Sequence, residues 1–169
     1  MKHKYHHGDL ANSLVTATVA LLETRGVAQL SLREVARAAG VSHGAPAHHF
    51  GDKAGLLTAV AIQGYRLLAA QLMESQTLPG RTREQRLLDA GFAYIRFALS
   101  QTAYFNVMFQ PALTHSETPE YQAAARAAKT VLEKCIRDFL LNRSPGTPVT
   151  EKQIEATIIA LWSQVHGFA

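Results

Sequence analysis

The amino-acid sequence predicts an all-α fold, and three observations lead to this prediction. Nearly every segment of the 169-residue chain repeats its apolar residues with the period of a helix, and no stretch alternates like a half-buried strand. Ser31–Glu34 and Thr150–Gln153 both have the Ser/Thr-x-x-Glu/Gln pattern of a capping box. Glycine and proline separate the periodic segments. We expect about eight helices: three short ones with tight turns, then a long helix that leads into an antiparallel bundle.

The residues at their ends define the first two helices. Asp9 can cap a helix over residues 10–25, and Gly26 ends it as the first residue beyond the last turn. The capping box that begins at Ser31 opens a second helix, which closes at Gly40. The apolar side of this second helix is expected to consist of Leu32, Val35, Ala36 and Ala39.

The segment that follows fits the second half of a helix-turn-helix. Gly40 tolerates the positive φ of a tight turn, and the small Ala36 suits the point where two helices cross. Ser42 can cap a third helix over residues 43–50. Pro46 forfeits one backbone bond in a helix capped by Ser42, and a start one residue later removes that cost. The apolar side chains expected to hold this helix down are Val35, Val41 and Phe50.

The rest of the chain continues with helical period. Asp52 caps a long helix that ends near residues 78–80, where Leu-Pro-Gly breaks it. Further helices are predicted over residues 82–100, 103–109, 119–141 and 151–169. The last of them carries no stop residue by Ala169, so we expect the C-terminal part to be incomplete there. The predicted division is a helix-turn-helix domain over 1–53, a linking helix over about 53–76 and a helical domain over 77–169.

Charge and histidine content single out the N-terminal part. The net charge is +4 with a pI of about 9.4. Residues 1–53 hold six of the eight histidines and six Lys or Arg residues against four acids. Partial protonation of these imidazoles makes this end more positive, which suits a polyanionic partner.

Several classes of protein are not expected. The single cysteine, Cys135, allows no disulfide within the chain and is expected to be a packed thiol in a reducing compartment. We find no secretory signal pattern and expect no membrane-spanning helix, which favours a cytoplasmic protein. Catalytic triads, paired carboxylates and phosphate-binding glycine loops are not evident, so we expect no enzyme and no cofactor.

The clustered histidines raise the alternative of a zinc site. His3, His6 and His7, or His43, His48 and His49, could supply imidazole ligands. Zinc sites usually add cysteine or carboxylate ligands at fixed spacing, and Cys135 lies far along the chain. We therefore expect no metal. By the helix period, His49 points toward the core while His43 and His48 face outward.

These motifs resemble a known family. The segment from Ser31 to Ser42, Ser-Leu-Arg-Glu-Val-Ala-Arg-Ala-Ala-Gly-Val-Ser, precedes a short helix that ends in His49-Phe50 and then Asp-Lys-Ala-Gly-Leu-Leu. Over residues 5–70 this pattern resembles the N-terminal domain of the TetR family of transcriptional repressors. The ending Trp162…Val165-His166-Gly167 resembles a group of TetR C-terminal domains that carry a Trp-His-Gly motif.

The resemblance implies that the third helix lies in the major groove of double-stranded DNA. It places His43, Gly44 and Ala47 at base edges. It places His48, His49 and Lys53 at phosphates, with Ser31, Arg33 and Ser42 beside them. The family commonly has an aromatic residue where this chain has Ala47, and an apolar residue such as Leu where it has Pro46. Ala47 offers a thymine methyl a contact but no hydrogen bond, so these differences concern which bases are read.

For the C-terminal bundle, the resemblance implies a pocket for a small-molecule effector and a homodimer formed through the last two helices, which would bind a pseudo-palindromic operator. The segment over residues 104–110 is the preferred lining, although aromatic residues at helical spacing are also what a bundle core needs. The leading function is a ligand-responsive repressor. The alternative is a helical small-molecule-binding module with weak or lost DNA recognition. The candidate lining residues are Phe92, Phe97, Tyr104, Phe105, Met108, Phe109 and Trp162.

Overall fold

The computed structural model describes residues 7–143, 146 and 148–168, and it describes side chains from residue 10 onward. His3, His6 and most of the turn over 144–148 lie outside the described residues. Within them the chain is helical, as predicted, and contains no strand. Its elements are α1 (His7–Arg25), α2 (Leu32–Ala38), α3 (Ala45–Phe50), α4 (Lys53–Ser75), α5 (Arg83–Ser100), α6 (Thr102–Met108), the 3₁₀ helix η1 (Pro111–Leu113), α7 (Pro119–Arg143) and α8 (Glu151–Gly167).

The chain forms two compact units. The first, called the N-terminal unit below, comprises residues up to Gly64 together with Thr102–Tyr121. The second, called the C-terminal unit, comprises Tyr65–Gln101 and the residues from Gln122 onward. Helix α4 continues from the first unit into the second, and α7 does the same three residues after its start.

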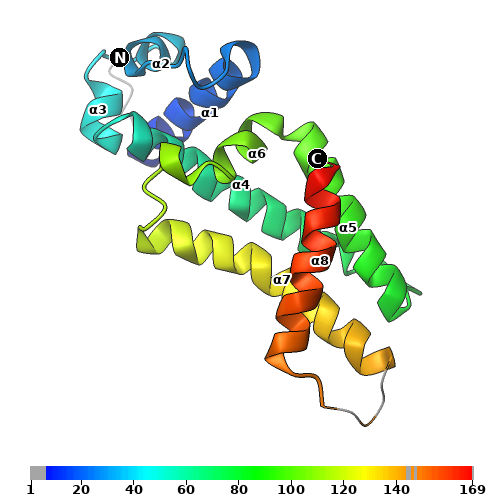
Figure 1. The fold of residues 1–169 in the computed structure, drawn as a ribbon. Helices are drawn as coiled ribbons and strands as arrows, with labels where there is room; N and C mark the ends of the chain where they lie inside the picture. The colour runs from blue at the N-terminus through cyan, green and yellow to red at the C-terminus, as the bar shows by residue number, and fades with distance from the viewer. Residues whose placement is uncertain (1–6, 144–145, 147, 169) are drawn as a thin grey trace. The chain divides into compact units, whose positions relative to one another are not determined.

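The N-terminal unit is built around α1. Helix α1 packs on α2 and α6, and α2 packs on α3 (Figure 1). The predicted turn residues Gly26 and Gly40 both have positive φ, at 71° and 67°. Helix α1 begins at His7, before Asp9, so Asp9 is not its cap; helix ends are the features that sequence patterns fix least. The core of this unit includes Leu14, Val15, Leu22, Val35, Ala36, Leu56, Leu57, Val60, Tyr104, Phe105 and Met108.

A glycine inside α4 lets this helix approach α6. Gly64 is buried, and a Cβ built there would stand 2.5 Å from Met108 Sδ and 3.1 Å from Tyr104 Cβ. Real Cβ atoms essentially never show the first separation and rarely show the second, so a larger residue would force Met108 or Tyr104 to shift. The close packing explains why glycine occupies a helix interior, where it costs roughly 0.5–1 kcal/mol relative to alanine.

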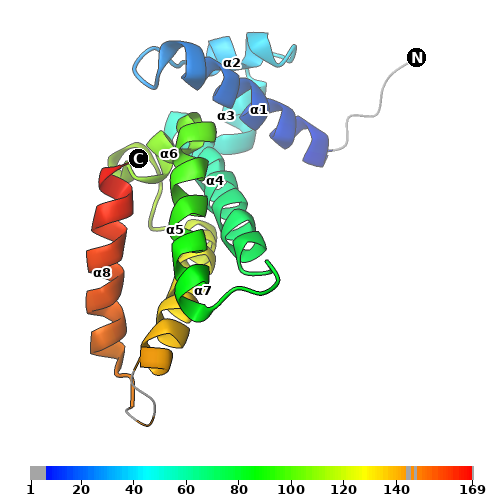
Figure 2. The ribbon, with the colours of Figure 1, turned by 90° about the vertical axis from the view of Figure 1, so that its right-hand side faces the viewer.

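In the C-terminal unit, α5 and α8 lie side by side (Figure 2). Thr150 and Gln153 form both halves of the predicted capping box at the start of α8. A second complete box joins Thr82 and Gln85 at the start of α5. Cys135 is buried, and burial raises the pKa of its thiol, which agrees with a packed cysteine. Other buried side chains of this unit are Leu68, Leu72, Ala90, Ala93, Phe97, Ala124, Ala128, Ile136 and Ile154.

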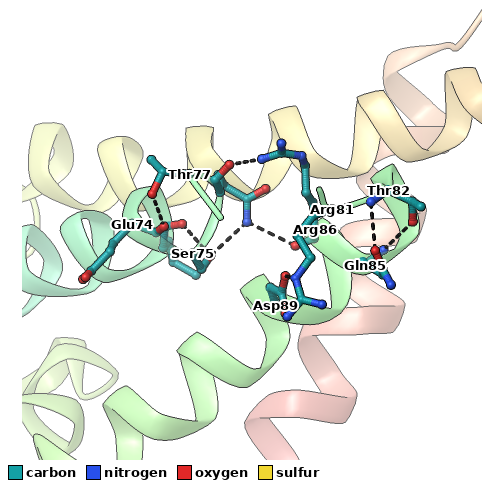
Figure 3. A network of polar contacts seen from close by, with 10 residues as sticks. Glu74, Ser75, Thr77, Arg81, Thr82, Gln85, Arg86 and Asp89 are labelled. Atoms are coloured by element: carbon teal, nitrogen blue, oxygen red, sulfur yellow. Dashed lines mark hydrogen bonds and ion pairs between the residues drawn. The ribbon is translucent and has the colours of Figure 1, made fainter. Parts of the chain in front are cut away.

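Polar contacts hold the connection between α4 and α5 (Figure 3). The Arg86 guanidinium donates to the carbonyl of Gln76, and the Gln76 side chain donates to Ser75 Oγ at 2.9 Å and to the Arg86 carbonyl at 3.1 Å. Arg81 Nε lies 3.0 Å from Asp89 Oδ2, close enough for an ion pair but without the alignment of a hydrogen bond. This network fixes the turn through which the chain reverses before α5.

Helix α4 is both long and apolar. One stretch of α4 has a mean hydropathy of 1.3, and by length and composition alone the helix could cross a membrane. Half of that stretch is buried inside the protein, and the core helix of a soluble protein passes the same test.

Candidate nucleic-acid interface

The start of α2 is held by a cluster around Glu34. The Ser31 hydroxyl accepts a hydrogen bond from the Glu34 backbone N–H at 3.3 Å, which is one half of the predicted capping box. The Glu34 carboxylate accepts from the Ser31 hydroxyl at 2.9 Å and from Arg25 at 2.8 Å. The hydrogen bond from Ser31 is the largest cause that lowers the pKa of Glu34, and the charge of Arg25 adds to it. The cluster ties the end of α1 to the start of α2.

Helix α3 starts later than a Ser42 cap allows, which corrects the sequence prediction. Its N-cap is Gly44, without a side-chain hydrogen bond, and the Ser42 carbonyl accepts from Ala45 N at 3.0 Å. Pro46 therefore occupies the first turn, where backbone N–H groups have no partner within the helix, so no bond is lost. Its ring is among the most fully buried side chains. Proline thus serves both as a helix start and as the apolar anchor of α3.

The outer face of α3 carries most of the predicted DNA contacts. His43, Gly44, Ala47 and His48 are exposed, and His49 is exposed as well. The expectation that His49 turns toward the core is therefore wrong: its ring packs edge-on against Phe50, with ring centroids 4.6 Å apart. Pro46, in the first turn of α3, takes the inward position. The other predicted contacts at the start of this motif, Ser31, Arg33 and Ser42, are also exposed.

The first turn of α4 follows α3 directly. Asp52 caps it as predicted, because Gly55 N donates to Asp52 Oδ1 at 2.7 Å. A Cβ at Gly55 would collide with the Phe50 carbonyl, so only glycine fits there. Lys53 is half-buried, and its ammonium donates to the Val27 carbonyl at 2.7 Å, in the turn between α1 and α2. This bond gives a structural reason for a cation in the first turn of a helix, where the dipole disfavours it.

His115 also contacts this turn, and sequence reasoning did not single it out. Its ring Nε2 lies 3.2 Å from Asp52 Oδ1, and its backbone N–H donates to Thr58 Oγ1 at 2.8 Å. The hydrogen bond from Gly55 N is the main cause that lowers the pKa of Asp52, and His115 contributes. The two side chains are 63 residues apart, so no local pattern could reveal the contact.

The structure does not bring the seven candidate lining residues of the effector pocket together. Phe92 and Trp162 border one cavity of about 230 Å³ in the C-terminal unit. Phe97 is fully buried and borders a second cavity in that unit. Tyr104, Phe105, Met108 and Phe109 belong to the N-terminal unit, and the first three are core residues there.

The cavity that Phe92 and Trp162 border is formed mainly by α5 and α8, and none of its lining residues is charged. The Trp162 indole N–H donates to the Tyr94 hydroxyl at 3.2 Å, and this hydroxyl lies 2.9 Å from His166 Nδ1. The Trp162 and His166 rings stack with centroids 4.6 Å apart. Burial raises the pKa of Tyr94 to about 12. The lining residues are Leu72, Leu87, Leu88, Ala90, Gly91, Phe92, Tyr94, Ile95, Leu132, Leu161, Trp162, Gln164 and Val165.

Two family models match the chain. The model for bacterial regulatory proteins of the tetR family matches residues 14–60, which span the helix-turn-helix and the start of α4. A model for a tetracyclin repressor-like C-terminal domain matches residues 87–169, which include all but one of the residues that line the cavity between α5 and α8. Among curated protein sequences, none matches significantly.

Solved structures have the same fold. A protein of unknown function from Rhodococcus sp. RHA1 is 28% identical, with a TM-score of 0.81 over 98% of this chain and 84% of its own. A regulatory protein of the tetR family from Rhodococcus RHA1 is 21% identical, with a TM-score of 0.70 over 92% of this chain and 80% of its own. The TetR family regulator PfmR from Thermus thermophilus is 18% identical, with a TM-score of 0.67 over 92% and 86%. The chain therefore belongs to the TetR family of DNA-binding, ligand-responsive transcriptional regulators.

Proposed function

We propose that this regulator is a repressor that reads its operator with the outer face of α3. The carrying observation is that His43, Gly44, Ala47 and His48 are all exposed along one short segment, which runs from the turn before α3 into the helix and which the buried Pro46 anchors from behind. Small groups and imidazoles at base edges leave room for close approach of the helix to the major groove. We assign base contacts to His43, Gly44 and Ala47.

We assign phosphate contacts to the rim of the same surface. Ser31 and Arg33 stand at the start of α2, Ser42 before α3, and His48 and His49 near its end. Such contacts set the orientation of the protein on DNA without specifying sequence. Lys53 keeps its proposed phosphate contact in addition to its bond to Val27, because an ammonium carries three donors.

The experiment is a gel shift with promoter DNA that flanks the gene, at two salt concentrations. Wild-type protein is expected to bind selectively, with an affinity that falls steeply as salt rises. Arg33→Ala should weaken binding to all sequences and flatten the salt dependence, whereas His43→Ala should change the preference among operator variants. Arg126→Ala, at an exposed position of α7, is the matched control. If His43→Ala and Arg33→Ala both lower the affinity for all operator variants by the same factor, the division into base and phosphate contacts is wrong.

We further propose that the cavity between α5 and α8 binds the effector. Its lining is uncharged, so it suits an uncharged and largely apolar molecule that can also hydrogen-bond near Tyr94 and Gln164. The probe is N-phenyl-1-naphthylamine, whose fluorescence rises in apolar sites. Phe92→Ala should reduce the fluorescence gain, whereas Phe168→Ala, at an exposed residue outside this lining, should not. Equal gains in both variants would place the probe elsewhere.

The proposed assembly is a homodimer that binds a pseudo-palindromic operator in the cytoplasm. Exposed apolar side chains on α8, Ile159 and Trp162, support a surface for self-association, because monomers rarely expose such groups together. Residues 1–53 are proposed as the DNA-binding domain and 77–169 as the effector and dimerisation domain, with no enzymatic role. Light scattering at increasing protein concentration tests the dimer, and Ile159→Glu should shift the mass toward the monomer.

A further inference from the structure

His115 is unusually well held for a residue in a turn. It lies between η1 and α7, and it is only half-buried. Its backbone N–H donates to Thr58 Oγ1 at 2.8 Å. Its carbonyl accepts from Thr118 N at 3.2 Å and from Thr118 Oγ1 at 2.9 Å. The backbone contacts hold the imidazole at a fixed place beside the start of α4.

The imidazole of His115 stands between two carboxylates. Nε2 lies 3.2 Å from Asp52 Oδ1, and Nδ1 lies 3.8 Å from Glu117 Oε1. A neutral imidazole has a single N–H and can donate to only one of them, whereas the imidazolium carries an N–H on both nitrogens. The arrangement is therefore best satisfied when His115 is protonated, and the charged groups that face it come from the start of α4 and from its own turn.

Asp52 connects this contact to the recognition helix. It follows the last residue of α3, Phe50, after Gly51, whose φ is 79°. The same Oδ1 atom that faces His115 also accepts from Gly55 N, and Gly55 packs directly under the Phe50 carbonyl. A displacement of Asp52 would therefore move the first turn of α4 and the C-terminal end of α3 together.

We propose that protonated His115 is a positioning residue for operator binding: through Asp52 it holds the start of α4, and with it the end of α3, in the arrangement that fits DNA. This inference rests on the proposed function. Pre-ordering a binding surface reduces the entropy lost on association. Only the imidazolium can donate to both carboxylates, so the contact should be stronger at pH 6 than at pH 8. The lowered pKa of Asp52 keeps its carboxylate charged at both pH values.

The test compares His115→Gln and Asp52→Asn with wild type on one operator duplex, selected by wild-type protein from a random-sequence library. Asn retains the oxygen that caps Gly55, so Asp52→Asn removes the charge and keeps the cap. Affinities are measured at pH 6 and pH 8, and the affinity of each variant is divided by the affinity of wild type at the same pH. This ratio removes the contribution of the exposed His43, His48 and His49, which wild type and variants share.

Each single variant should bind about two- to fivefold more weakly than wild type at pH 6 and nearly equally at pH 8, as expected for an exposed ion pair. The double variant should bind the operator no more weakly than the single variant with the lower affinity, because both substitutions remove the same contact. Glu155→Gln, which removes a carboxylate at an exposed position of α8, is the charge-matched control and should leave affinity unchanged at both pH values.

Variant-to-wild-type ratios that are equal at the two pH values, or additive effects in the double variant, would overturn the positioning role. Circular dichroism checks the fold at both pH values. If His115→Gln unfolds, the affinities of Asp52→Asn decide whether the positioning role holds. Failure to select any duplex with wild-type protein would instead refute the proposed function, and this inference with it.

Discussion

Single carboxylates with several partners secure the helix starts of the N-terminal unit. Glu34 joins the cap of α2 to Arg25 of α1, and Asp52 joins the cap of α4 to His115. Both groups have lowered pKa values: that of Glu34 chiefly because of the hydrogen bond from Ser31 and then the charge of Arg25, and that of Asp52 chiefly because of the hydrogen bond from Gly55 N and then the contact with His115. A carboxyl group with a lowered folded-state pKa stabilises the protein above its unfolded pKa, and this contribution disappears as pH falls through the folded value.

For Glu34 this linkage predicts the sign of a pH effect. Its unfolded value lies near 4.5 and its folded value lies lower, so its contribution is complete at neutral pH and lost in the acid range below 4.5. Glu34→Gln should therefore lower the melting temperature at pH 7 and lower it less at pH 3. Thermal unfolding followed by circular dichroism measures both. Glu155→Gln, at an exposed position of α8, is the control, and an equal loss at both pH values would refute the role of the Glu34 charge.

For Tyr94 the predicted effect of pH on stability has the opposite sign. Burial raises its pKa from 10 to about 12, so the folded state holds the phenolic proton more tightly than the unfolded state does. Its contribution is complete below pH 10 and is lost between pH 10 and about 12. Absorbance titration should show one tyrosine that ionises near pH 12 in wild type and is missing in Tyr94→Phe. Ionisation of all tyrosines near pH 10 in the folded protein would contradict the burial of Tyr94.

Sequence patterns predicted the elements well where helices are long. The apolar period located α1, α4, α5, α7 and α8, and glycines marked the ends of α1 and α2. The sequence patterns failed on α3, the shortest helix of the helix-turn-helix. Helix α3 has six residues and begins two residues later than predicted, and successive side chains of a helix differ in direction by about 100°. In so short a helix the apolar period could not decide which residues face inward, and the structure buries Pro46 and exposes His49.

Gly64 offers a test of packing between elements. Gly64→Ala should destabilise the protein by roughly 1–2 kcal/mol, because overpacking against Tyr104 and Met108 exceeds the gain in helix propensity. Gly91→Ala is the matched control in α5, since its Cβ would meet Val165 at an ordinary 3.6 Å. The control should be neutral or stabilising by up to about 1 kcal/mol. Urea unfolding of both variants measures the difference, and equal stabilities would show that α6 yields to the added methyl.

For the molecule as a whole, the division into parts departs from the order of the chain. Residues 102–121 join the unit that holds the helix-turn-helix, although they lie between segments of the other unit. Contacts such as His115 with Asp52 create this arrangement, and the apolar period carries no information about partners so distant in sequence. The helix-turn-helix is different, because its turn residues and caps lie close together along the chain, so its helices could be predicted from sequence.

The central claim is that the exposed face of α3 reads DNA. Its most direct test is the affinity of Ala47→Asp for the operator duplex selected by wild-type protein. Ala47 is exposed, so the substitution should leave the melting temperature almost unchanged while it sets a carboxylate against the electronegative groove. We predict loss of detectable binding at a salt concentration where wild type binds tightly. Binding of a folded Ala47→Asp protein with wild-type affinity would contradict the assignment of α3 as the recognition helix.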